Sequence, residues 1–182
     1  YCHPARLDRG RSGVVGRSTE LLVPRARVRQ GAFVTGVPQA AIDLAKRFEG
    51  FHHVPKHDPG RAYPYICPAG YWTIGYGRLC DPQHPPISKA DGEAYLLQDL
   101  GIAMTAALRY CPVLATEPES RLAAIVDFTF NLGAGRLQTS TLRRRVNQRD
   151  WNAAASELRR WIYGGGRVLP GLVARRQAEI AL

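Results

Sequence analysis

The chain has 182 residues, the length of one domain or of one domain with two lobes. Hydrophobic residues make up 45% and charged residues 22%, a balance that excludes a wholly disordered protein. Because the chain has 25 Lys and Arg but only 15 Asp and Glu, the formal net charge is +10. This excess predicts a polyanionic partner, which can be nucleic acid, an anionic surface or an acidic polymer.

Neither a membrane span nor a signal peptide is predicted. The best apolar stretch, residues 31–45, contains Pro38 and Asp43 and falls short of the ~18 apolar residues that a spanning helix needs. Arg residues interrupt each early apolar stretch. The four cysteines have no CxxC spacing and are too sparse for a disulfide framework, so we expect small buried thiols and neither a bound metal nor a cofactor.

Residues 1–36 differ in composition from the rest of the chain. They hold seven Arg and two acids, with scattered Gly, Ser and Pro and no sustained hydrophobic period. This composition predicts a basic, loosely ordered N-terminal arm. Residues 37–182 are expected to form the folded domain.

The first periodic segment predicts a helix. Residues 38–50 place Ile42, Ala45 and Phe48 at helical spacing, and Gly50 is a natural stop. Residues 51–70 are rich in His, Pro and Gly and predict an irregular excursion. The aromatic and β-branched segment 71–77 predicts a strand and turn that pairs with residues 62–66 as a small hairpin.

The remainder of the chain is expected to be helical. The capping-box pattern at Ser88 predicts a helix whose buried face carries Leu97, Leu100, Met104 and Leu108. Further helices are expected from Thr116, over residues 136–146, from Asp150 to the glycines at 164–166, and after Pro170. A small β-containing lobe followed by a helical lobe is the α+β class, and such a layout leaves a cleft between its lobes.

Glu49 is the first candidate for chemistry. It lies at the C-terminal end of the first predicted helix, where the helix dipole disfavours a carboxylate and favours its protonated form. A protonated Glu is what a glycosidase uses as its general acid. Taken alone, Glu49 is better explained as a solvated acid at a helix end, and Thr73 as a packed strand residue.

Four motifs in order change that interpretation. They are FEG at 48–50, CPAGYWTIGYG at 67–77, FNLGAG at 130–135 and GGGRVLPGLVARRQAE at 164–179. Together they resemble the phage-type lysozymes, the endolysins of glycoside hydrolase family 24, over residues 38–182. The resemblance implies a lysozyme-like fold with two lobes and a cleft.

The resemblance also implies an activity, the hydrolysis of the β-1,4 bond between N-acetylmuramic acid and N-acetylglucosamine in bacterial peptidoglycan. Glu49 would protonate the leaving oxygen, while Cys67 and Thr73 would place a water on the opposite face of the sugar, as inversion requires. A retaining route through a Cys67 nucleophile is the alternative. Tyr76, Asn131 and Arg175 are expected to bind substrate, and Arg175 or Arg176 is expected to pair with Glu49.

The same resemblance implies a setting for the protein. A monomer would reach the wall from the host cytoplasm with the help of a holin and lyse the host cell. The basic arm could adsorb to anionic envelope components, and nucleic acid is not expected as a partner.

The second catalytic position departs from the family pattern. The family usually has eight residues between the Glu and the second member, whereas 17 separate Glu49 from Cys67. Asp58 stands at the usual distance and is the alternative. We favour Cys67 because Thr73 follows it by six positions, as in the family, whereas Pro64 stands six positions after Asp58. The extra residues, about 52–61, are expected to bulge from the small lobe.

Two other classes of function compete with the enzyme. One is a basic module that binds nucleic acid or membranes, which the net charge favours although no helix-turn-helix or aromatic stacking motif accompanies it. The other is a protein of lysozyme fold that binds the wall or another polyanion without cutting it. His52, His53 and His57 could suggest a metal, but Pro55 interrupts any helical spacing among them, and we expect none.

Overall fold

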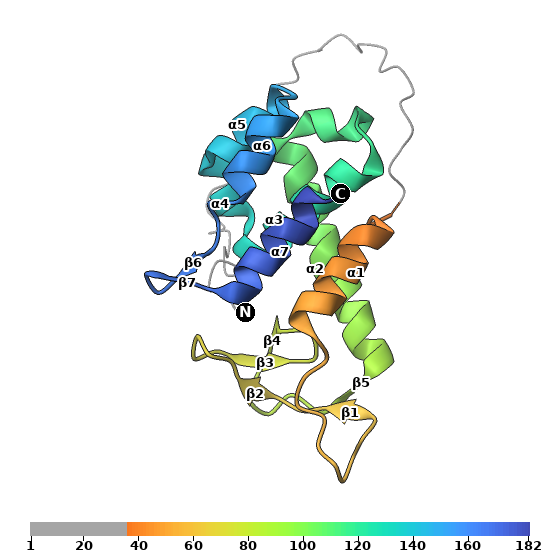
Figure 1. Ribbon diagram of the computed structural model, residues 1–182. Coiled ribbons are helices and arrows are strands. Elements are labelled where there is room, and N and C mark those ends of the chain that lie inside the picture. The colour runs from red at the N-terminus through yellow and green to blue at the C-terminus, as the bar shows by residue number, and fades with distance from the viewer. Residues whose placement is uncertain (1–35) are drawn as a thin grey trace, which may run out of the picture.

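The computed structural model describes residues 36–182, so the predicted N-terminal arm, apart from Gly36, lies outside the described residues. Helices form one lobe and short strands form most of the other, with α1 and α2 running between them (Figure 1). This arrangement confirms the predicted α+β class. The helices are α1 (Gln39–Glu49), α2 (Lys89–Tyr110), the 3-10 helix η2 (Pro112–Thr116), α3 (Glu119–Leu132), α4 (Ala134–Thr139), α5 (Thr141–Asn147), α6 (Trp151–Leu158) and α7 (Pro170–Ile180).

Short antiparallel strands build the small lobe. In the central sheet, β2 pairs with β3 and β3 with β4, so that Tyr65 lies opposite Thr73 and Ile66 opposite Trp72. This register confirms the predicted hairpin between residues 62–66 and 71–77. A second pair joins β1 to β5 beside it. The strands are β1 (Arg61–Ala62), β2 (Tyr65–Ile66), β3 (Trp72–Ile74), β4 (Arg78–Leu79), β5 (Ile87–Ser88), β6 (Tyr163–Gly164) and β7 (Arg167–Val168).

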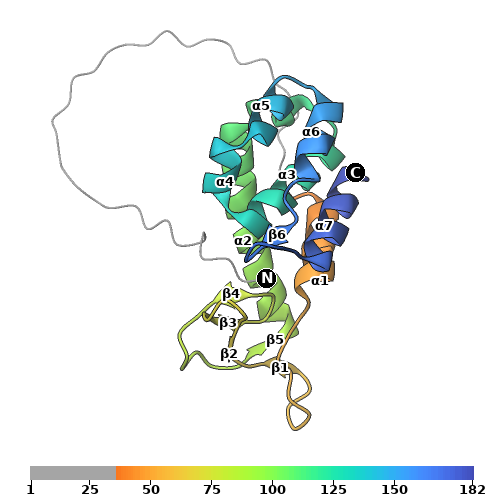
Figure 2. The same cartoon turned by 60° about the vertical axis from the view of Figure 1, so that its left-hand side comes forward.

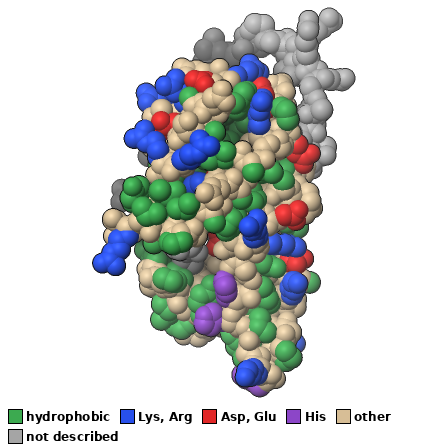
Figure 3. All heavy atoms as spheres, viewed as in Figure 1, with side chains coloured by type: hydrophobic (Ala, Val, Ile, Leu, Met, Phe, Trp, Pro, Cys, Tyr) green, Lys and Arg blue, Asp and Glu red, His purple; other side chains and the backbone are tan. Residues whose placement is uncertain are grey.

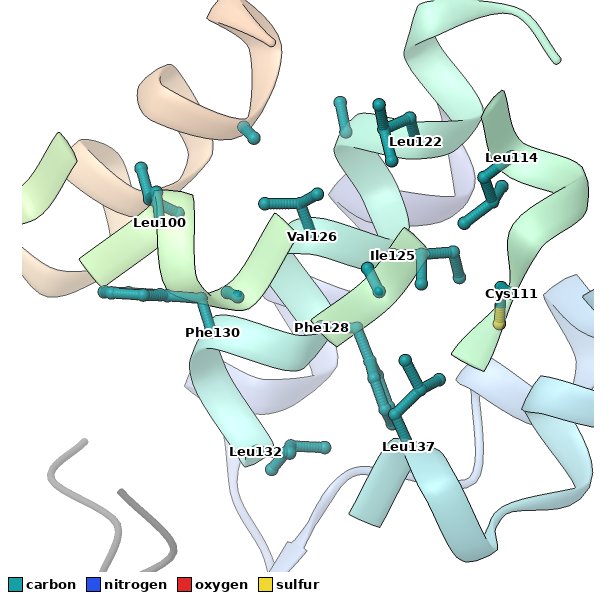
Figure 4. Packing of buried hydrophobic residues seen from close by; sticks show 14 of the residues in the cluster. Leu100, Cys111, Leu114, Leu122, Ile125, Val126, Phe128, Phe130, Leu132 and Leu137 are labelled. Atoms are coloured by element: carbon teal, nitrogen blue, oxygen red, sulfur yellow. The ribbon is translucent and has the colours of Figure 1, made fainter. Parts of the chain in front are cut away.

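Helix α3 is the centre of the helical lobe. Every residue from Leu122 to Leu132 is buried, which is typical of a helix that other helices enclose. Its side chains point to several neighbours: Val126 and Phe130 lie toward Leu100 of α2, and Phe128 lies toward Leu137 of α4 (Figure 4). This packing fixes α3 as the support against which α1 and α7 are placed.

The start of α2 is as predicted, and its predicted buried face is correct for Leu100, Met104 and Leu108 but wrong for Leu97. The Ser88 hydroxyl accepts from the Asp91 backbone N–H at 3.1 Å, and the Asp91 carboxylate accepts from the Ser88 N–H at 3.0 Å, which completes a capping box. The buried face carries Leu96 and Leu100 with small residues, whereas Leu97 is 44% exposed. Ala103 and Ala107 are buried, while Met104 and Leu108 beside them are half-buried, so the centre of the buried face is turned by about one residue from the prediction.

Two predicted helix limits in the C-terminal half are wrong. Helix α3 begins at Glu119 after Pro118, and Thr116 ends the preceding 3-10 helix, where its hydroxyl donates to the Val113 carbonyl. The single helix expected over residues 136–146 is two, because the buried Ser140 leaves the helical conformation and caps α5 by accepting from the Arg143 N–H at 3.0 Å.

The glycines at 164–166 do not end a helix as predicted. Helix α6 has Asp150 as its N-cap but ends at Leu158, so Trp161 lies beyond it. Gly165 and Gly166 have φ values of 57° and 76° and form the turn of a hairpin between β6 and β7. The expected helix after Pro170 is α7. Within residues 36–182, no helix is both long and apolar enough to cross a membrane.

Candidate active site

The register of α1 places Glu49 on the buried side of the helix. Ala41, Ala45 and Glu49 recur at four-residue intervals, and all three are buried. The helix ends at Gly50, whose φ of 68° turns the chain toward the small lobe. Glu49 is therefore held at the junction of the two lobes, with its side chain only 4% exposed.

A pocket of about 350 Å³ opens at this junction. Its described wall combines residues from both lobes: Glu49, His52, His53, Tyr65, Cys67, Pro68 and Gly77. The His53 and Tyr65 rings stack, with 4.0 Å between their centroids. Figure 3 shows His side chains on the small-lobe side of the junction and hydrophobic side chains gathered over the β6–β7 hairpin on the other side. Aromatic walls around one acid suit a polar ligand with apolar faces, such as a sugar.

Arg175 of α7 connects Glu49 to Asp127 of α3. Its Nη1 donates to Glu49 Oε1 at 2.7 Å, while its Nε and Nη2 donate to the two oxygens of Asp127 at 2.8 Å each. Burial lowers the pKa of Arg175, but the adjoining Asp127 and Glu49 outweigh burial, so that the net shift is upward and the guanidinium stays charged. The predicted pairing with Glu49 therefore belongs to Arg175.

Arg175 donates to the Oε1 atom of the Glu49 carboxyl group. The other, Oε2, lies on the Gly77 side, where a β-carbon added at Gly77 would stand 3.5 Å away. Gly77 itself has a φ of 83°, a conformation that few other residues adopt, and it lines the pocket. Glu49 therefore has one carboxyl oxygen beside Arg175 and the other on the side of the pocket-lining Gly77.

A second buried group extends the network along α7. Arg176 donates from Nη2 to Asn131 Oδ1 at 3.1 Å and contacts the carboxyl group of Glu179. Burial raises the pKa of Glu179 well above its usual range; Arg176 acts in the opposite direction, and the nearby Asp127 adds to the rise. Three acids and two arginines are thus packed among α1, α3 and α7, a combination that is electrically neutral with one proton bound.

Cys67 and Asp58 are placed differently. Cys67 is buried in the turn between β2 and β3 and lines the pocket with Glu49. Asp58 lies in the irregular segment before β1, accepts a hydrogen bond from the Tyr63 hydroxyl at 3.0 Å and is not part of the described pocket wall. In both ribbon views this segment extends from the far end of the small lobe (Figures 1 and 2). The geometry favours Cys67 as the group that shares the pocket with Glu49.

The remaining predicted site residues lie behind the pocket wall. Thr73 is fully buried on β3, and its hydroxyl donates to the Tyr65 carbonyl at 3.3 Å. Tyr76 is 7% exposed and packs against Phe51 with ring centroids 5.4 Å apart, and Asn131 is 4% exposed and holds Arg176. In this structure Tyr76, Asn131 and Arg175 support the site from within the protein, and the described wall does not include them.

The cysteines and histidines show neither a disulfide nor a metal cluster in the described part of the chain. Cys67, Cys80 and Cys111 are not joined to one another. Over residues 36–182, no group of three or more His, Cys, Asp or Glu side chains has the arrangement of a metal site. His52 and His53 instead belong to the pocket wall.

Comparison with known proteins identifies the family. Residues 46–179 match the phage lysozyme family. The chain belongs to the phage lysozyme family. It is 33% identical over 151 residues to an endolysin of Acyrthosiphon pisum secondary endosymbiont phage 1, covering 80% of this chain and 96% of that protein. It is 34% identical over 148 residues to an endolysin of Bacillus phage B103, again over 80% of this chain, but it spans only 53% of that protein's length.

A solved structure extends this likeness to the fold. The muramidase domain of SpmX from Asticaccaulis excentricus is similar with a TM-score of 0.66 and 27% identity, over 80% of this chain and 95% of that one. The fold that positions Glu49 in this chain is therefore similar to that of the SpmX domain.

Sequence patterns did not predict every residue of the pocket wall and of the buried network behind it. Asp127 looked like one more position of an apolar helix, and only its pairing with Arg175, 48 residues away, gives it a role. His52, His53 and Tyr65 lie in or beside a segment without periodic pattern. A polar residue within the buried run 122–132 was the one signal that could have marked Asp127.

Proposed function

We propose that this protein is a muramidase that hydrolyses the β-1,4 bond between N-acetylmuramic acid and N-acetylglucosamine in bacterial peptidoglycan and so lyses the host cell. The observation that carries the proposal is the buried Glu49 in the wall of an interlobe pocket, held by Arg175 in a chain of the phage lysozyme family. The endolysin relatives and the SpmX muramidase domain support the same activity.

Glu49 is assigned as the general acid. Its carboxyl group would give its proton to the glycosidic oxygen as the bond to the anomeric carbon breaks. Cys67 and Thr73 are assigned to the water that attacks the anomeric carbon from the opposite face. Cys67 would contact this water, whose surplus proton would pass to solvent in the open pocket as its oxygen bonds to the anomeric carbon. Thr73 would act through the β2–β3 turn, because its own hydroxyl is buried against Tyr65.

The test is release of reducing ends from isolated peptidoglycan. Wild type is expected to release them, and Glu49→Gln is expected to lower the rate by about 100- to 10,000-fold, because an amide cannot supply the proton. Glu119→Gln, an exposed substitution at the start of α3, is the matched control and should act like wild type. If wild type sediments with the wall but releases no reducing ends, the protein is a wall-binding member of the fold and the enzyme proposal fails.

The stereochemical outcome follows from the same assignment. With a water held by Cys67, the first product should carry the inverted anomeric configuration, which proton NMR can detect before the sugar mutarotates. A product that retains its configuration would instead point to Cys67 as a nucleophile.

A further inference from the structure

The net charge of the folded domain is concentrated in one segment. Residues 134–160 contain seven Arg and only two acids, Asp150 and Glu157. The remaining described residues, 36–133 and 161–182, contain eleven Lys or Arg and eleven Asp or Glu. The whole positive excess of the described chain therefore lies on α4, α5, α6 and the turns that join them.

These arginines lie at the surface. Six of them are exposed and Arg143 is half-buried; the exposed ones are Arg136, Arg144, Arg145, Arg149, Arg159 and Arg160. Both ribbon views place α5 and α6 at the end of the molecule away from the small lobe (Figures 1 and 2). Lys and Arg side chains gather over this end in the space-filling view (Figure 3). The positive surface is thus separate from the pocket that contains Glu49.

Helix α5 carries a polar hollow within this surface. The hollow has a volume of about 270 Å³ and is lined by Thr141, Arg144, Arg145 and Gln148, which share one face of the helix. Arg144 donates to the Thr141 hydroxyl at 2.9 Å, and Arg145 lies 3.4 Å from the Gln148 side-chain oxygen. Arg144 is oriented by a neutral hydroxyl, whereas Arg145 also lies 3.6 Å from Asp150. Arg149 and Arg160 pair with Glu117 and Glu157 at exposed positions, where such pairs are weak and other anions can compete for the guanidinium groups.

The surface fits phosphate better than it fits a bilayer or exposed bases. A guanidinium group can give two parallel hydrogen bonds to a phosphate, and several in one patch steer a polyanion toward it. No large hydrophobic side chain between residues 134 and 160 is strongly exposed, so this described segment has nothing to insert into a bilayer and no exposed aromatic platform for bases.

We propose that the arginine-rich surface of α4–α6 binds a phosphodiester polymer attached to the bacterial wall. The polymer would hold the domain on the wall while the pocket at the junction of the lobes acts on the glycan. The location of the protein at the bacterial wall rests on the proposed muramidase function, whereas the binding of the polymer by the arginines does not.

The binding test uses the full chain with Glu49→Gln, so that the wall is not digested. The surface variant adds Arg144→Gln, Arg145→Gln, Arg159→Gln and Arg160→Gln. The matched control instead adds Arg47→Gln, Lys56→Gln, Lys89→Gln and Arg109→Gln, which remove the same charge from exposed positions elsewhere. Each protein is sedimented with sacculi that carry poly(glycerol phosphate) and with the same sacculi after hydrofluoric acid has removed that polymer.

The surface variant should bind the polymer-bearing sacculi about tenfold more weakly than the control, and this difference should shrink as salt screens the charges. On stripped sacculi the two variants should bind alike. The proposal fails if both lose binding equally, if stripping leaves the binding of the parent unchanged, or if duplex DNA or phosphatidylglycerol vesicles, but not poly(glycerol phosphate), distinguish the two variants.

Reducing-end release separates this proposal from the proposed function. With Glu49 restored, the surface variant should digest stripped sacculi at the wild-type rate and polymer-bearing sacculi more slowly. Polymer-dependent binding without any release of reducing ends would overturn the proposed muramidase function but support the proposed binding surface. Normal release of reducing ends, with no effect of the arginine substitutions, would support the muramidase function and overturn the binding surface.

Discussion

Glu49 and Cys67 lie in one pocket wall although 17 residues separate them in the chain. The irregular segment after α1 carries the chain away to the end of the small lobe, and the β2–β3 hairpin brings it back (Figure 1). The extra residues, about 52–61, therefore lengthen the spacing between Glu49 and Cys67 in the sequence without removing Cys67 from the pocket. The local frame from Cys67 to Thr73 survives because one hairpin contains both residues.

The role of Cys67 can be tested by substitution. Cys67→Ser should retain more activity than Glu49→Gln, because a hydroxyl can still hydrogen-bond a water whereas an amide at position 49 cannot give a proton. Rates of peptidoglycan clearing measure this, with Cys80→Ser, outside the described pocket wall, as the control. Equal loss of activity in both variants would indicate a chemical role for the thiol.

Asp127 is a second residue whose role is testable. Asp127→Ala should lower the free energy of unfolding by about 3–5 kcal/mol, because Arg175 would keep its buried charge with Glu49 as its remaining carboxylate partner. Urea denaturation measures the change. Asp43→Ala, exposed on α1, is the control and should change stability by less than about 0.5 kcal/mol. Similar losses for both variants would contradict the assigned role.

At the scale of elements, short segments are arranged by caps and glycines. A buried serine divides the predicted helix 136–146, and two glycines with positive φ convert a predicted helix end into the β6–β7 hairpin. Gly164 also allows close packing, since an added β-carbon would lie 2.5 Å from Leu169 Cδ1. These elements are shorter than the window over which hydrophobic periodicity can be recognised.

Ser140→Ala tests the junction of α4 and α5. The variant removes an acceptor for the Arg143 N–H and a donor to the Leu137 carbonyl, so we expect a loss of about 1 kcal/mol in the free energy of unfolding. Thermal unfolding can measure it. Ser156→Ala, an exposed serine inside α6, should have a smaller effect. A cap role is contradicted if Ser140→Ala is as stable as wild type.

At the scale of the molecule, buried charges join three helices around Glu49. Glu49 comes from α1, Asp127 and Asn131 from α3, and Arg175 and Arg176 from α7. Glu179 of α7 contacts Arg176 in this network, and because burial raises its pKa, its protonation is linked to folding.

Glu179 gives this linkage a definite sign. Burial raises the pKa of Glu179 well above 4.5, so the folded protein retains a proton that the unfolded chain releases near that pH. This group therefore makes stability fall as the pH rises above about 4.5, until the folded acid also ionises. The side chain introduced by Glu179→Gln is neutral in both the folded and the unfolded state. The free energy of unfolding of this variant should therefore fall less steeply with rising pH than that of wild type.

Urea unfolding of wild type, Glu179→Gln and Glu119→Gln across about pH 4–8 measures the difference in slope. The Glu119→Gln control alters an exposed acid and should follow wild type. Parallel curves for wild type and Glu179→Gln would show that Glu179 keeps an ordinary pKa.

The sequence by itself determined the α+β class, the helix that ends at Glu49, the hairpin of Cys67 and Thr73, and the likeness to phage lysozymes. Each of these depends on residues close together in the chain, where periodicity, caps and motif spacing act. Only the tertiary structure decided that Arg175, 126 residues from Glu49, holds the acid and that Asp127 holds Arg175. It also decided that the arginines of residues 134–160 are exposed together at the end away from the small lobe. Such pairings depend on how distant helices pack against α3, and no local pattern in the chain encodes them.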